Sequence, residues 1–472
     1  MPIAPKRPSA VPAATSAATS AGDPDGGLRA STVADRRVMA VVTAVLLSIT
    51  VLQRFAVPVG PLLSVSVLVT IAGIAFLLYH GDVVENAPAM RVFVVAMAVC
   101  FLAAGIVLVS EGVGAVTSLV YLPVIWVAFA FTLHPARQHL YPRVLARFEA
   151  LMLVFAGIGI AQTLAQVAGV WAYRDYLLSW VPSSFLFLGY NTSNPIEYGA
   201  SVYRANAFVF LEPSIFAQFL ALALLSSLVR RASLLRAVVL GAAMICCISG
   251  TGLLYVAFGV VLLALRRGGV WTARIVVAAV VGGLVALATP FGAIIASRTD
   301  EASVDNSSGS LRFVQPYEQI LGTWATDPLT TLWGAGAGWA DQLADQIFGA
   351  TGLPINFSGI AKLVLEYGIP ATVLFATFAV LAIARRSPSP TLAWSGLFAN
   401  AVLTGALLQP QVLYVLLPLC SLFIGYRFER DLDDERRASA RSAAEDHARE
   451  VAEAAQVRVT VAPADPNGRG GA

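Results

Sequence analysis

Long apolar runs recur along this chain and leave it few ways to fold. Between residues 38 and 426 they alternate with short polar links, most of which carry arginine. A run of about 20 apolar residues is long enough for one helix to cross a bilayer. Because the bilayer core offers no water, a spanning segment must satisfy its own backbone hydrogen bonds, as a helix does. The runs therefore predict an all-α integral membrane protein.

The composition agrees with this prediction. The chain of 472 residues is 57% hydrophobic and only 12% charged, whereas a soluble domain carries about 25% charged residues. Its net charge of +3 is too small to indicate a nucleic-acid partner. No histidine lies near another histidine or a cysteine at ligand spacing, so the sequence predicts no metal site and no cofactor. The cysteines lie in apolar runs, as buried apolar side chains do: Cys100, Cys246, Cys247 and Cys420.

The apolar runs and the arginines between them predict about twelve transmembrane helices. The run 234–265 is too long for one ordinary crossing, and Ser-Gly-Thr-Gly at 249–252 interrupts it, so we expect two short spans there. With this count every pair of adjacent arginines falls on the cytoplasmic side, as the positive-inside rule requires. The predicted spans are 38–53, 60–79, 92–110, 114–132, 149–170, 208–228, the two within 234–265, 272–294, 359–384, 391–408 and 411–426.

The same pattern divides the chain into three parts. Residues 1–35 are rich in Ala, Pro, Ser and Thr and predict a disordered cytoplasmic tail. Residues 36–428 form the polytopic membrane domain, with two large outward-facing loops at about 172–206 and 296–357. Residues 429–472 form a charged tail, so both termini are expected in the cytoplasm.

One stretch, residues 203–214, places two charges at the entrance of a predicted span. Arg204 and Glu212 precede the apolar run that begins at Ile215. Charges at the edge of a span are costly to desolvate and often functional. The alternative for Glu212 is a helix start, because Pro213 suits the first helical turn and a carboxylate suits the positive end of the helix dipole.

A few basic residues remain on the predicted outer side, against the positive-inside trend. An arginine fork binds phosphate oxygens through two hydrogen bonds and stays charged, so a diphosphate is the expected partner. The alternative is a set of ordinary loop salt bridges, for which Asp175, Glu197, Asp300 and Glu301 are available. The basic residues concerned are Arg54, Arg174, Arg204, Arg298, Arg312 and Lys362.

The second outer loop also contains a glycine run, Gly-Ala-Gly-Ala-Gly at 334–338. Its glycines, with Gly336 at the centre, allow a tight turn and a close approach of the backbone to a sugar or phosphate. Further along, Lys362 and Glu366 are one helical turn apart. They predict an (i, i+4) ion pair, with substrate binding as the alternative.

Several of these motifs resemble one family. Arg-Ala-Asn-Ala-Phe-Val-Phe-Leu-Glu-Pro-Ser (204–214) is similar to the arginine-led entry to a span in the O-antigen ligase and Wzy-type polysaccharide polymerase superfamily. The order of the motifs that follow also resembles that superfamily, and the resemblance covers roughly residues 35–427. These motifs are Ser-Gly-Thr-Gly (249–252), Ser-Gly-Ser-Leu-Arg-Phe (308–313), the glycine run (334–338) and Leu-Val-Leu-Glu-Tyr-Gly-Ile-Pro (363–370).

The resemblance implies a metal-independent glycosyltransferase in the bacterial cytoplasmic membrane. Its donor would be an oligosaccharide on undecaprenyl diphosphate, with a chain-length regulator and a flippase as further partners. Arg204 and Arg312 would bind the diphosphate, with Arg174 and Arg298 as second choices. Glu212 would be the general base.

The sequence departs from the ligase pattern at one place. Ligases of this superfamily carry a histidine shortly before an element like Glu366-Tyr367-Gly368, and residues 354–359 here contain none. This favours a polymerase of O-antigen or exopolysaccharide. A ligase that transfers a finished glycan and a flippase or other transporter of lipid-linked oligosaccharide stay open as alternatives.

Overall fold

A computed structural model describes residues 24–58, 62–111, 114–196, 199–267 and 309–435, and isolated residues up to 449. The described chain is mostly helical, and five helices are long and apolar enough to cross a membrane: Ala87–Ser110, Pro135–Val167, Pro213–Arg230, Gly250–Arg267 and Gly359–Ala384. Three shorter apolar helices accompany them: Val65–Tyr79, Val116–Ala130 and Leu234–Cys246. These helices give the chain the build of a helical membrane protein. The predicted span 272–294 and Arg298 lie outside the described residues.

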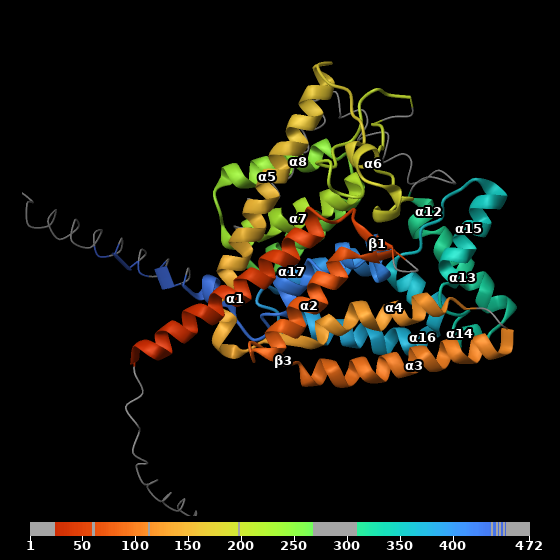
Figure 1. The fold of residues 1–472 in the computed structure, drawn as a ribbon, viewed down its shortest axis with the longest axis horizontal. Helices are drawn as coiled ribbons and strands as arrows, with labels where there is room; N and C mark the ends of the chain where they lie inside the picture. The colour runs from red at the N-terminus through yellow and green to blue at the C-terminus, as the bar shows by residue number, and fades with distance from the viewer. Residues whose placement is uncertain are drawn as a thin grey trace, which may run out of the picture.

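Figure 1 shows the helices and strands, coloured from red at the N-terminus to blue at the C-terminus. The long helices of the first half are α1 (Pro24–Thr50), α2 (Val65–Tyr79), α3 (Ala87–Glu111), α4 (Val116–Trp126), α5 (Tyr141–Val167), α7 (Pro213–Arg230), α8 (Leu234–Cys246) and α9 (Gly250–Arg267). The second half holds α13 (Gln315–Thr326), α15 (Trp339–Thr351), α16 (Gly359–Ala379) and α17 (Pro390–Phe398). The short helical segments are η1 (Val127–Ala130), η2 (Pro135–Leu140), α6 (Tyr176–Trp180), η3 (Ser183–Phe185), α12 (Ser310–Phe313), α14 (Thr330–Trp333), η5 (Val380–Ala384), η6 (Ala399–Leu403), η7 (Ala406–Leu408), α18 (Pro410–Leu413) and η8 (Leu417–Ser421).

The predominantly helical fold agrees with the all-α prediction, and two short strand pairs accompany the helices. Strand β1 (Ala56–Pro58) pairs antiparallel with β2 (Leu62–Ser64), and β3 (Val83–Glu85) pairs antiparallel with β4 (Phe131–Leu133). Each strand has three residues, too few to show a period of two in the sequence. The second pair ties the link after α2 to the link before α5.

The links between the helices gather at two ends of the bundle. Leu133 donates its N–H to Leu422, Gly425 donates to Arg386, and Arg266 lies 3.8 Å from Glu429. We call this the arginine end. Helix α5 runs from there to Gln166, whose amide donates to the Tyr203 carbonyl in the segment 171–212. We call that end, which also holds residues 309–358, the loop end.

Several predicted boundaries agree with the structure, and others need correction. Helices α8 and α9 are separate and meet near Ser249, as predicted, and the α16–η5 unit covers 359–384. However, the described part of the predicted second outer loop is largely helical, from α12 to α15. The turn predicted around Gln409 begins earlier, because η6 ends at Leu403.

Helix α7 begins at Pro213 instead of near residue 208. Ala207 and Phe208 have positive φ angles of 49° and 63°, which a right-handed helix does not allow. Gln162 on α5 holds this backbone by accepting the N–H of Ala207 at 3.1 Å, and Asn206 accepts the N–H of Phe208 at 3.1 Å. A contact from another helix therefore decides where α7 starts.

The folded body includes part of each predicted tail. Helix α1 begins at Pro24, inside the segment 1–35 that was expected to be disordered. Asp35 pairs there with Arg137 at 3.3 Å. At the other end, Glu429 is only 1% exposed and accepts hydrogen bonds from Ser389 and Thr391. Ion pairs and hydrogen bonds to the helices extend the folded body beyond both limits.

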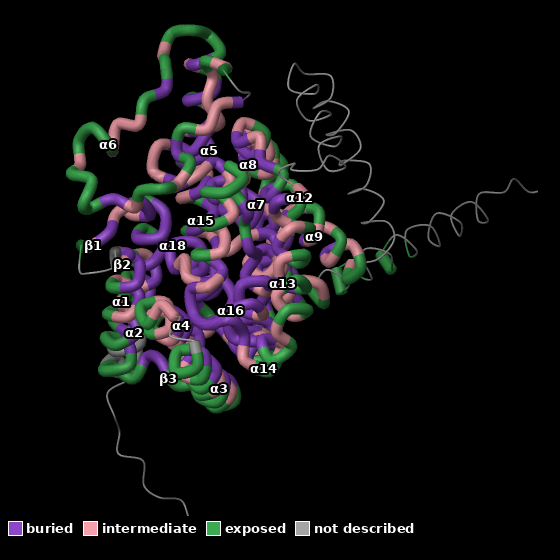
Figure 2. Tube along the Cα trace, turned by 90° about the vertical axis from the view of Figure 1, so that its right-hand side faces the viewer, coloured by how far each residue is buried: buried purple, intermediate pink, exposed green. Residues whose placement is uncertain are grey.

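Helices from distant parts of the sequence form the centre of the bundle. Helix α16 packs along α3 (Figure 1), and α7 packs against both α8 and α9. Buried residues concentrate on α7, α16 and α18, whereas α3 exposes one side (Figure 2). Buried α16 is thus a central helix, and the exposed side of α3 is suited to face lipid.

We expect the loop end to face outward, because the paired arginines gather at the other end. A single cysteine at the exposed position Ser193 should react with an impermeant thiol reagent in intact cells. One at exposed Ser439 should react only after the cells are permeabilised. The opposite pattern would invert the orientation.

Candidate functional site

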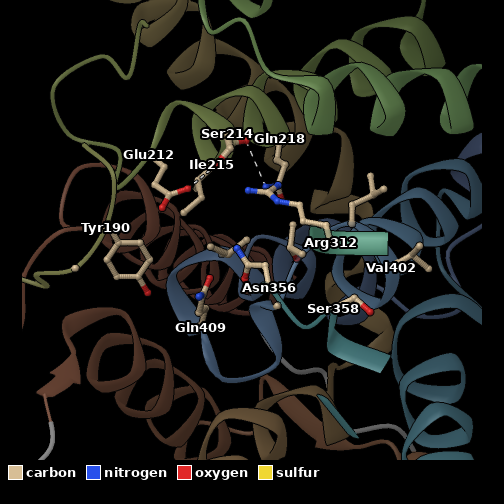
Figure 3. A pocket seen from close by; sticks show the side chains of 15 residues that line it. Tyr190, Glu212, Ser214, Ile215, Gln218, Arg312, Asn356, Ser358, Val402 and Gln409 are labelled. Atoms are coloured by element: carbon tan, nitrogen blue, oxygen red, sulfur yellow. Dashed lines mark hydrogen bonds between the residues drawn. The ribbon is translucent and has the colours of Figure 1, made fainter. Parts of the chain in front are cut away.

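A polar cavity of about 240 Å³ opens at the loop end. Five separate segments supply its walls: the loop before α7, the first turns of α7, helix α12, the segment before α16 and the break between η6 and α18 (Figure 3). Its polar lining residues are Tyr190, Glu212, Ser214, Gln218, Arg312, Asn356, Ser358, Thr404 and Gln409. The fold therefore brings together residues more than two hundred positions apart.

Glu212 supplies the carboxylate of this cavity. It is the residue immediately before α7, and Pro213 occupies the first helical turn, as the helix-start alternative predicts. Its side chain does not cap the helix, however. Oε2 accepts the Ser214 hydroxyl at 2.8 Å and Oε1 accepts the Asn191 N–H at 3.3 Å. These bonds fix the carboxylate at the cavity wall, where it can accept a proton from a bound hydroxyl group.

Arg312 supplies a positive charge in the same cavity. Helix α12 carries it, and one of its Nη atoms lies 3.4 Å from the Thr251 hydroxyl at the start of α9. Its guanidinium extends toward Gln218 on α7 (Figure 3). A guanidinium in a polar cavity is suited to bind phosphate oxygens. The structure therefore brings the predicted residues Glu212 and Arg312 into one site.

The rest of the lining offers neutral hydrogen-bonding groups. Burial and the neighbouring Glu212 carboxylate raise the pKa of Tyr190 to about 12, so its hydroxyl stays protonated and can donate a hydrogen bond. Asn356 and Gln409 add amide groups to the cavity wall and lie below Glu212 and Ser214 in the view of Figure 3. Hydroxyl and amide groups can donate to and accept from the hydroxyl groups of a sugar.

Arg204 and Arg174 do not line this cavity. Arg204 directs its two Nη atoms to the backbone carbonyls of Ile248 and Ile196, both at 3.4 Å. Arg174 is exposed in the segment between α5 and α6. Arg204 and Arg312 contact residues three positions apart around the start of α9, Ile248 and Thr251, and the clamp of one diphosphate between the two arginines stays a prediction.

The glycine run packs against α16 instead of opening into the cavity. Gly336 donates its N–H to the carbonyl of Glu366 at 3.1 Å, and Ala335 donates to Leu365 at 2.7 Å. Gly334 and Gly368 both have positive φ, and a Cβ on either would collide with backbone atoms of the other segment. In this structure the close approach that the glycines permit is to the protein's own backbone.

Lys362 and Glu366 lie beside this contact. Their Nζ and Oε1 atoms are 3.9 Å apart, which confirms the predicted (i, i+4) pair. The closer partner of Lys362 is Asp341, at 2.6 Å, which joins α15 to α16. Lys362 is 6% exposed and Glu366 is fully buried, so this group fastens two helices together and does not line the cavity.

A buried ion pair supports the loop that carries Tyr190. Arg54, only 1% exposed, donates through both Nη atoms to the two carboxylate oxygens of Asp175, at 2.8 and 2.7 Å. Burial raises the pKa of Asp175, but Arg54, Thr192 and the Leu178 N–H outweigh it, so the net pKa is lowered. Arg54 therefore forms a loop salt bridge, which was the alternative to phosphate binding, and it links the segment after α1 to the loop.

The sequence pattern does not single out the neutral residues of the cavity. Gln218 is a single amide within an apolar helix, which is a usable signal, since polar residues inside spans are often functional. Tyr190 and Asn356 lie in loops, where no period or spacing distinguishes them from their neighbours. Among the described residues, no cluster of His, Cys, Asp and Glu side chains could hold a metal ion.

Comparison of the chain with protein-family models finds no match, and comparison with curated proteins finds no significant similarity.

Proposed function

We propose that this protein polymerises a cell-surface polysaccharide, an O-antigen or exopolysaccharide. The observation that carries the proposal is the meeting of Glu212 and Arg312 in one polar cavity at the loop end. This end is the one expected to face outward, where a lipid-linked donor is available. The donor we propose is an oligosaccharide on undecaprenyl diphosphate in the cytoplasmic membrane.

The cavity offers the groups that such a transfer needs. A hydroxyl oxygen of the acceptor sugar attacks the anomeric carbon of the donor and forms the new glycosidic bond. The bond from that carbon to the diphosphate oxygen breaks, and the lipid diphosphate leaves with the bonding electrons. Glu212 takes the hydroxyl proton, and Arg312 stabilises the negative charge on the leaving group. Tyr190 and the amides orient the sugar by hydrogen bonds.

A polymerase is favoured over the ligase alternative by the residues before α16. Residues 354–359 line the cavity through Asn356 and Ser358 and contain no histidine. Transporters tend to carry charged or broken helices at the bilayer midplane. Here the cavity's charged groups lie at the start of α7 and in α12, at the loop end of the bundle.

Replacing Arg312 with alanine should lower polymer formation by about 10²–10³-fold, because a site poor in water loses one charge-assisted contact to the leaving group. Arg312→Lys should restore little, because an ammonium lacks the two-pronged fork. The measurement is the lipid-linked species in cells that depend on the variant. We expect single repeat units to accumulate, as in cells that lack the protein.

Membrane levels of each variant provide the control for folding. Normal polymer from Arg312→Ala at equal protein level would remove Arg312 from the mechanism. Accumulation of finished lipid-linked polymer in cells lacking the protein would instead identify a ligase.

A further inference from the structure

A second cavity, of about 440 Å³, lies at the arginine end of the bundle. Three segments contribute arginines to its lining. Arg266 lies in the last turn of α9, Arg385 and Arg386 follow η5, and Arg427 and Arg430 follow η8. We call it the arginine cavity. It lies at the end of the helices opposite to the candidate site.

Buried hydrogen bonds hold the walls of this cavity in place. Glu429 is 1% exposed, and its carboxylate accepts the hydroxyls of Ser389 at 2.8 Å and Thr391 at 2.6 Å. Its backbone N–H donates to Pro388, and that of Gly425 donates to Arg386. These bonds join the two arginine-bearing segments backbone to backbone, so their spacing is set by the fold.

Carboxylates of the protein neutralise the charge of the cavity's arginines only in small part. Arg266 lies 3.8 Å from Glu429, and no other arginine of the cavity forms an ion pair with a carboxylate among the described residues. The Glu429 oxygens already accept hydrogen bonds from Ser389 and Thr391. All five arginine side chains are exposed, so their donors are available to a ligand. The cavity therefore concentrates positive charge that an anion could neutralise.

The cavity lies where two candidate membrane spans end, at the level expected for the membrane surface. The candidate spans Gly250–Arg267 and Gly359–Ala384 both end at it. The ends of spanning helices lie at the level of lipid head groups, and basic pockets between helices there attract anionic head groups. The positive-inside rule alone explains arginines in links, but not a cavity that three segments line with five of them.

We propose that the arginine cavity binds a phosphate ester. Arginine forks match the geometry of phosphate oxygens and make charge-assisted hydrogen bonds to them. The ester can belong to an acidic phospholipid or to a soluble molecule. The proposal does not depend on the function proposed for the loop end.

The test uses purified full-length protein in a neutral detergent and the variant Arg385→Gln with Arg386→Gln. Native mass spectrometry measures binding of phosphatidylglycerol, and of phosphatidylcholine with the same acyl chains. Calorimetry measures binding of glycerol phosphate. The matched control is Arg91→Gln with Arg143→Gln, which removes the same charge from two exposed arginines outside the cavity.

We expect the cavity variant to bind its phosphate ester at least about tenfold more weakly, and the control variant to bind like the wild type. Loss in the phosphatidylglycerol arm identifies a lipid head group, and loss only in the glycerol phosphate arm identifies a soluble ester. The proposal is overturned if the cavity variant binds both esters as the wild type does. It is also overturned if the cavity and control variants lose affinity equally.

Discussion

Replacing Glu212 with glutamine is expected to lower the rate of glycan transfer by about 10²–10⁴-fold, the usual contribution of a general base. The amide has nearly the same shape: its carbonyl oxygen can still accept the Asn191 N–H, and its NH2 group can donate to the Ser214 hydroxyl, which now donates to the carboxylate. It cannot take a proton from the acceptor hydroxyl. The measurement is the initial rate of repeat addition by purified protein in lipid, with the thermal unfolding temperature recorded for each variant.

A matched substitution separates catalysis from a structural role. Glu318 lies exposed in the first turn of α13 at the same end and does not line the cavity. Glu318→Gln should therefore transfer glycan at the wild-type rate. If Glu212→Gln is as active as Glu318→Gln, then Glu212 only starts the helix. If it unfolds at a lower temperature with an unchanged rate, the helix-start role is again the one supported.

The largest effect on stability is expected at Arg54. Substituting methionine leaves the Asp175 carboxylate buried without its cation, which should cost about 3–5 kcal/mol of unfolding free energy. Asp175 also accepts the Thr192 hydroxyl at 2.9 Å, so the loop that carries Tyr190 should loosen. Chemical denaturation in detergent, read by tryptophan fluorescence, measures the change.

A double-mutant cycle shows whether the cost comes from the unpaired charge. Arg54→Met combined with Asp175→Asn should be more stable than Arg54→Met alone, because no charge is then left unpaired in the buried site. A double variant whose loss equals the sum of the two single losses would show that the pair contributes no coupling.

The sequence predicts those elements whose signal is local. The bounds of the α16–η5 unit follow from its apolar run, and the division of 234–265 follows from its length and from the glycines at 250 and 252. The Lys362–Glu366 pair follows from helical geometry alone. In each case the residues that decide the structure lie within about one helix of one another.

The start of α7 and the make-up of the cavity depend on long-range contacts. Gln162, some 45 positions earlier in the chain, fixes the backbone at Ala207, and no local pattern reveals this. The meeting of Glu212 with Arg312 depends on how α7 and α12 pack. The sequence also offers the motifs containing Arg204 and Gly336 for phosphate binding. In the structure Arg204 donates to the Ile248 carbonyl and the Gly336 N–H donates to the Glu366 carbonyl, contacts that the motifs do not reveal.

The most direct test of the proposed function is elongation by the isolated protein. Wild-type protein in lipid bilayers is supplied with undecaprenyl-diphosphate-linked single repeats, and chain length is read by gel and mass spectrometry. We expect a ladder of lengthening chains on the lipid carrier and release of free undecaprenyl diphosphate, without added metal. Single repeats that stay unextended, while finished lipid-linked polymer is transferred intact to another acceptor, would contradict it.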